Sequence, residues 1–64
     1  MYTYDEKMAH IVAQFMHFDQ ALANDEQNKV IYYGQKIIDL QNKYEITHYP
    51  SEMIAEIIAD NRKD

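Results

Sequence analysis

The sequence has no cysteine and no tryptophan, and only one glycine and one proline in 64 residues. Without cysteine, neither a disulfide nor a thiolate zinc site can stabilise the fold. Average usage is about 7% glycine and 5% proline, so loops should be few and short. A domain of this size buries only about 60% of the surface that its unfolded chain exposes. We therefore expect a second subunit or a partner to provide part of its stability.

Long apolar runs are also absent. No segment approaches the roughly 18 apolar residues that read as a membrane span. The N-terminus, Met-Tyr-Thr-Tyr-Asp-Glu-Lys, is polar and acidic, unlike the basic region and apolar run of a signal peptide. The sequence predicts a single cytoplasmic domain over residues 1–64 with no membrane partner.

Positive charge is scarce, because 11 acidic residues face 6 basic ones and the formal net charge at pH 7 is −5. Binding to a phosphate backbone draws on lysine and arginine, which makes direct nucleic-acid binding unfavourable. An acidic surface permits a basic protein partner or mimicry of nucleic-acid charge. It is also the ordinary surface of a small soluble protein.

Two patterns predict a long antiparallel αα-hairpin over about 4–23 and 25–44. Apolar side chains recur at steps of three and four at positions 4, 8, 11, 15, 18 and 22, and again at 30, 33, 37, 40 and 44. Thr3 followed by Glu6 predicts a capping box at the first start, and Asn24 followed by Gln27 predicts another at the second. The very short connection makes the two helices antiparallel neighbours.

A short third helix is predicted over about 51–60. Pro50 suits a first helical turn and Ser51 a cap. Together the three segments predict an all-α, three-helix domain whose last helix covers only one end of the hairpin. Gly34, inside the second helix, indicates either a close helix approach or a tolerated glycine.

The hairpin has more apolar surface than the short helix can cover. Val12 and Met16 widen the stripe of the first helix, and Ile31 and Ile38 form a second row on the second helix. The sequence therefore predicts a homodimer at micromolar concentration with these four residues near its interface.

A candidate partner-binding surface combines aromatic residues with charge. Glu52, Glu56 and Asp60 recur every four residues on the third helix, Tyr49 stands just before it, and Tyr32 points away from the apolar seam. We expect these five residues to bind a protein partner. The ordinary alternative is that the acidic row faces water or the lysines of the second helix, at positions 29, 36 and 43.

No catalytic or metal-binding set is recognisable in the sequence. His10 and His17 lie two turns, about 10 Å, apart along a helix and cannot share one ion. Ser51 is the only serine, and no glycine-rich phosphate loop is present. We expect no enzymatic activity, no cofactor and no metal.

The leading hypothesis is a small acidic protein-interaction module, a homodimeric regulator or inhibitor of a protein partner. The alternative is an acidic nucleic-acid mimic that blocks a nucleic-acid-binding enzyme. In its build, though without a shared motif, the chain resembles short regulators and inhibitors of bacteria and their phages, including anti-CRISPR-type proteins. A helix-turn-helix-like transcription factor is a weaker alternative, because the third helix has no basic residue before Arg62.

Overall fold

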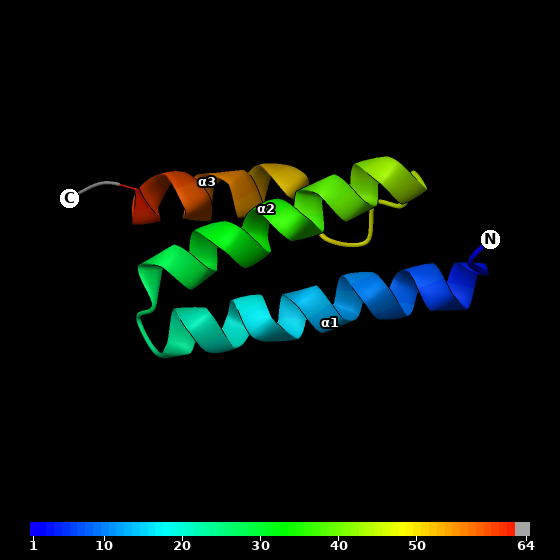
Figure 1. The fold of residues 1–64 in the computed structure, drawn as a ribbon. Helices are drawn as coiled ribbons and strands as arrows, with labels where there is room; N and C mark the ends of the chain where they lie inside the picture. Colours follow the sequence, from blue (N-terminus) through cyan, green and yellow to red (C-terminus); the bar gives the residue numbers. More distant parts are fainter. Residues whose placement is uncertain (63–64) are drawn as a thin grey trace.

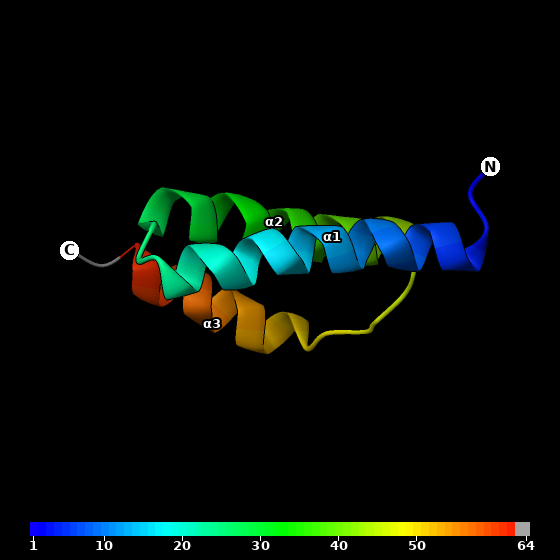
Figure 2. The same cartoon turned by 90° about the horizontal axis from the view of Figure 1, so that it is seen from below.

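The computed structural model describes residues 1–62 as three α-helices, each running antiparallel to the one before it (Figure 1). The helices are α1 (Tyr4–Ala23), α2 (Gln27–Tyr44) and α3 (Ser51–Asn61). The predicted all-α architecture, a long hairpin with a short third helix, is confirmed. Seen from below, α3 lies beneath the hairpin and not in its plane (Figure 2).

The start of α1 is the predicted capping box. The Thr3 hydroxyl accepts a hydrogen bond from the Glu6 backbone N–H at 3.2 Å, and the Glu6 carboxylate accepts one from the Thr3 backbone N–H at 3.1 Å. Asp5 and Glu6 occupy the first turn, where the helix dipole favours negative charge. Local sequence is enough to determine this helix start.

The predicted second capping box is wrong, and α2 begins two residues later than expected. Asn24 closes α1, Asp25 adopts a left-handed φ of 59°, and the Glu26 N–H donates to the Ala21 carbonyl at 2.9 Å. This is a Schellman-type helix end. Because the short connection needs a left-handed residue to reverse the chain, Asn24 belongs to the end of α1. The N-cap of α2 is then Glu26, which makes no side-chain capping bond.

The apolar core contains residues from all three helices. Its buried members are Ile11, Phe18, Ala21, Val30, Ile37, Ile54 and Ile58. Along α2, Ser51 lies at Gln41 and Ile58 at Gly34, so α3 runs antiparallel to α2 and covers it from Gln41 toward the hairpin turn. We call this part the covered half, and residues 1–10 and 42–48 the open end (Figures 1 and 2).

Gly34 marks a close approach of helices, as one of its two interpretations predicted. A Cβ atom at this position would lie 2.8 Å from Cγ1 of Ile58 and 2.9 Å from Cε1 of Phe18. Glycine is present here for lack of space and not for backbone freedom, because its φ is not positive.

Gln41 is a buried polar residue that fastens the loop between α2 and α3. Its Nε2 donates to the Tyr49 carbonyl (3.0 Å) and to the Ser51 hydroxyl (3.2 Å), while its Oε1 accepts from the N–H groups of His48 (2.9 Å) and Tyr49 (2.8 Å). The predicted Ser51 cap is therefore wrong. Its hydroxyl binds Gln41, and Pro50 is the N-cap of α3.

At the open end, α1 and α2 are held together by aromatic and histidine rings and by a lysine side chain. The Tyr44 hydroxyl lies 3.0 Å from Nδ1 of His10, and the Tyr2 ring packs edge-on against the His10 ring at 4.6 Å between centroids. The Lys7 ammonium lies 5.6 Å from the centre of the Tyr44 ring, within cation–π range. This polar aromatic cluster joins α1 to α2 beyond the reach of α3.

Candidate interaction surfaces

Concave features are small. A hollow of about 160 Å³ lies between α1 and α2 near the hairpin turn, next to His17, Lys29 and Tyr33. Pockets for small ligands usually measure about 300–1,000 Å³. A wider depression of about 430 Å³ is lined only by the consecutive residues 25–29 and is therefore open surface. The exposed faces of the helices are the better candidates for a functional site.

Two other kinds of site are absent from residues 1–62. No three histidine, aspartate or glutamate side chains in this range lie close enough to hold one metal ion. Among the same residues, no helix combines the length and the apolar character needed to cross a bilayer.

Among residues 1–62, three side chains have shifted pKa values, and each of them lies at a helix start. Hydrogen bonds from the Thr3 backbone and hydroxyl lower the pKa of Glu6. The ion pair between Lys29 and Glu26, at 2.7 Å, lowers the pKa of Glu26 and raises that of Lys29. All three charged groups are exposed to solvent, and their hydrogen bonds stabilise the first turns of α1 and α2.

The acidic face of α3 is defined by Glu52, Glu56, Asp60 and the neighbouring Met53. All four side chains are exposed, and Met53 retains 44% of its accessible surface. Among the described residues, neither Glu52 nor Glu56 has a basic group within 4 Å. The acidic face thus combines two unpaired carboxylates with an exposed methionine.

The lysines of α2 engage other partners. Lys29 pairs with Glu26, and the Lys36 ammonium lies 5.7 Å from the centre of the Tyr32 ring. Lys43 lies 5.8 Å from the centre of the Tyr44 ring. The alternative in which these lysines neutralise the acidic row is therefore not seen for Glu52 and Glu56.

The two candidate tyrosines have different surroundings. Tyr49 is half-buried, and its ring stacks on Phe15 with 4.0 Å between centroids, so the expectation of a free loop aromatic needs correction. Tyr32 keeps 55% of its surface exposed. It packs edge-on against Tyr33 and lies under the Lys36 ammonium, and both of these neighbours belong to α2. The structure does not gather both tyrosines with the acidic face.

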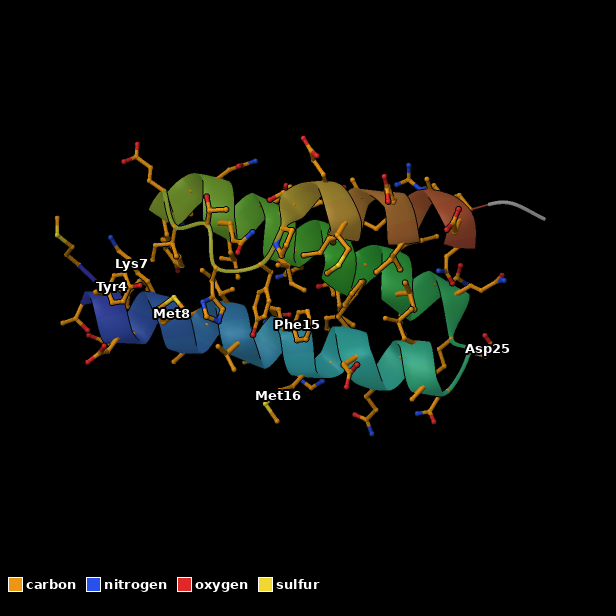
Figure 3. The ribbon with its side chains drawn as sticks, turned by 180° about the vertical axis from the view of Figure 1, so that it is seen from behind. Tyr4, Lys7, Met8, Phe15, Met16 and Asp25 are labelled. Atoms are coloured by element: carbon orange, nitrogen blue, oxygen red, sulfur yellow. The ribbon has the colours of Figure 1, made fainter. Side chains whose placement is uncertain are left out.

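The four candidate dimer residues fall into two groups. Ile31 and Ile38 are half-buried and pack against the core, so part of their surface is used within the chain. Val12 is half-buried on α1, and Met16 is 67% exposed. In Figure 3 the Met16 side chain projects from α1 away from the other two helices. Of these four residues, the most exposed one, Met16, therefore lies on α1.

Comparisons with protein-family models, with curated proteins and with solved structures found no match.

Proposed function

We propose that this chain is a small interaction module that regulates or inhibits a protein partner through the acidic face of α3. The observation that carries the proposal is the pair of exposed carboxylates, Glu52 and Glu56, without a cation within 4 Å among the described residues. Like charges spaced four residues apart on a helix repel each other. A basic partner surface relieves that repulsion.

Met53 strengthens the case for a protein partner. It lies one residue from Glu52 and three from Glu56, and 44% of its surface faces solvent. Methionine is unbranched and polarisable, and it adapts to irregular partner surfaces. A charged rim around an apolar contact is the usual arrangement of a protein interface. The hollow of about 160 Å³ between α1 and α2 is smaller than the usual pocket for a small ligand, which favours a contact with a protein surface.

The test compares two charge reversals of equal size. Glu56→Lys and Asp19→Lys each replace an exposed acid within a helix, one on α3 and one on α1. Immobilised wild type and both variants are used to capture partners from a lysate of the native host, with identification by mass spectrometry. We expect one protein, retained by wild type and by Asp19→Lys, to be lost with Glu56→Lys. Its retention should weaken as salt rises, because salt screens exposed charges.

Other results would decide against the proposal. If Glu56→Lys lowers the melting temperature and leaves capture per folded molecule unchanged, the acidic face is structural. If the captured protein binds nucleic acid and a DNA duplex releases it from the wild-type chain, the module acts as a nucleic-acid mimic. If the purified chain itself retains DNA at low salt, the transcription-factor alternative gains support.

A further inference from the structure

One row of apolar side chains runs along the surface of α1. Tyr4, Met8, Val12 and Met16 follow one another at steps of four residues, which places them in a single ridge on the helix. Tyr4 and Met16 keep 65% and 67% of their surface exposed, and Met8 and Val12 are half-exposed. Figure 3 shows Met8 on the near face of α1 and Met16 projecting away from the bundle. No described residue covers this ridge completely.

A row of small side chains lies beside the ridge. The adjacent row at steps of four contains Ala9 and Ala13, and both are exposed. Small side chains next to large ones leave room for a ridge from another helix. Packing of such ridges between two helices is the commonest arrangement in globular proteins, with the axes crossing at about −50°. The ridge and the row of small side chains lie on the same helix, so the surface is complementary to itself.

The same stretch has no charge. From Met8 to Phe18 the sequence contains no Asp, Glu, Lys or Arg, although 27% of the chain is charged. Two copies with a net charge of −5 each repel one another over most of their surfaces. Asp5 and Asp19 stand seven residues to either side of Val12, which is about 10 Å along the helix. Crossed helices diverge at that distance, so these carboxylates stay in water.

We infer that the occupant of this ridge is a second copy of the chain. In this homodimer the two α1 helices cross near Val12 and Ala13, and the Met16 ridge of each copy packs over the Ala9–Ala13 row of the other. The interface is isologous, as in most two-fold dimers. This assignment keeps Val12 and Met16 of the four residues that the sequence indicated and replaces Ile31 and Ile38 with Met8, Ala9 and Ala13.

The expected affinity follows from the size of the contact. Crossed helices touch over two to three turns, which places the interface below the roughly 1,200–2,000 Å² of a stable, specific complex. We therefore expect a dissociation constant on the order of 10–100 μM, since a small interface leaves little surplus over the entropy lost on association. The acidic face of α3 takes no part, so the inference stands independently of the proposed function.

The experiment uses one substitution at two matched positions. Ala13→Glu and Ala55→Glu each place a carboxylate on an exposed alanine within a helix, the first on α1 and the second on α3. The full chain and both variants are studied by sedimentation equilibrium from 5 to 500 μM, with circular dichroism to confirm the fold. We expect Ala13→Glu to weaken dimerisation at least about tenfold, because each of the two copies then places an unpaired carboxylate in the contact. Ala55→Glu should change it less than about twofold.

Concentration-dependent amide shifts provide a second, independent readout. In the wild type, the shifts that change between 5 and 500 μM should cluster from Met8 to Met16. A chain that stays monomeric over the whole range overturns the inference. A dimer weakened equally by both substitutions, or one whose shifts move at Ile31 and Ile38 and not on α1, overturns it as well.

Discussion

The covered half and the open end of one hairpin are held together by different interactions. In the covered half, Phe18, Gly34 and Ile58 meet in a space that has no room for an added methyl group. At the open end, Tyr44 meets His10 through a hydrogen bond and Lys7 through its ring. Apolar packing needs a third helix to exclude water. Where α3 does not reach, polar contacts that tolerate water take its place.

Gln41 lies at the boundary between the covered half and the open end, and its replacement should cause the largest loss of stability. Gln41→Met keeps the length of the side chain and removes all four of its hydrogen bonds. Because the His48 and Tyr49 N–H groups lose their acceptor, we expect a loss of about 2–3 kcal/mol in the free energy of unfolding. Urea unfolding followed by circular dichroism measures it. Gln35→Met, on the exposed side of α2, is the control and should stay within about 0.5 kcal/mol. Equal losses from both variants would show that the loop does not depend on Gln41.

Gly34→Ala tests the packing of the covered half. Within a helix, alanine is favoured over glycine by about 1 kcal/mol of intrinsic propensity. The added Cβ meets Ile58 and the buried Phe18 ring at under 3 Å, and overpacking costs about 1–3 kcal/mol. We expect a net loss of about 1 kcal/mol by urea unfolding. In an Ile58→Ala background the same substitution should cost less, because only the contact with Phe18 remains. A net gain in the wild-type background would contradict the close approach.

Glu45→Gly should stabilise the open end. Glu45 has a left-handed φ of 56° at the end of α2, where a side chain with a Cβ is disfavoured and glycine is preferred. We expect a gain of about 1 kcal/mol, measured as a higher midpoint in urea. Asp25→Gly, at the other left-handed residue, should gain less because aspartate tolerates this region better. Glu45→Ala is the control and should gain nothing.

Thr3→Ala should have the smallest effect and one that depends on pH. We expect a loss of about 0.5 kcal/mol near neutral pH. The Thr3 hydrogen bonds lower the pKa of Glu6, so their contribution is complete above the unfolded pKa and is lost as pH falls through the folded pKa. The difference between wild type and variant should therefore shrink in acid. An NMR titration of Glu6 should show its pKa moving part of the way toward 4.5 in the variant, because the Thr3 backbone N–H, the larger cause of the lowered pKa, is kept. An unchanged Glu6 pKa would mean that the Thr3 hydroxyl does not stabilise the Glu6 carboxylate in solution.

Local signals in the sequence predicted part of this structure well. The periodicity of apolar residues located the two long helices, and the Thr3–Glu6 pair located the start of α1. The same rule failed at Asn24, where the end of the preceding helix competes for the residue. It failed again at Ser51, whose hydroxyl is bound by a residue ten positions away. The role of Gln41 could have been suspected from the sequence, because it lies one turn after Ile37 on the apolar side of α2, where a polar residue needs hydrogen-bond partners.

The candidate surfaces were also predictable from the sequence only in part. The acidic row and the charge-free stretch of α1 can be read from the sequence, because both depend on residue type and helical spacing. Whether a given side chain is free depends on what packs beside it. Tyr49 looked like an exposed loop residue, yet its ring stacks on Phe15. Ile31 and Ile38 looked like surplus apolar surface, yet they pack against the core.

The sequence by itself determined the helices, their order and the chemistry of each face, since these follow from interactions among residues close together in the chain. Only the tertiary structure decided which apolar residues remain exposed and why Gly34 must lack a side chain. It also decided that Gln41 holds the loop. Those features arise where segments distant in the chain meet, and their packing depends on distances that no spacing of residues encodes.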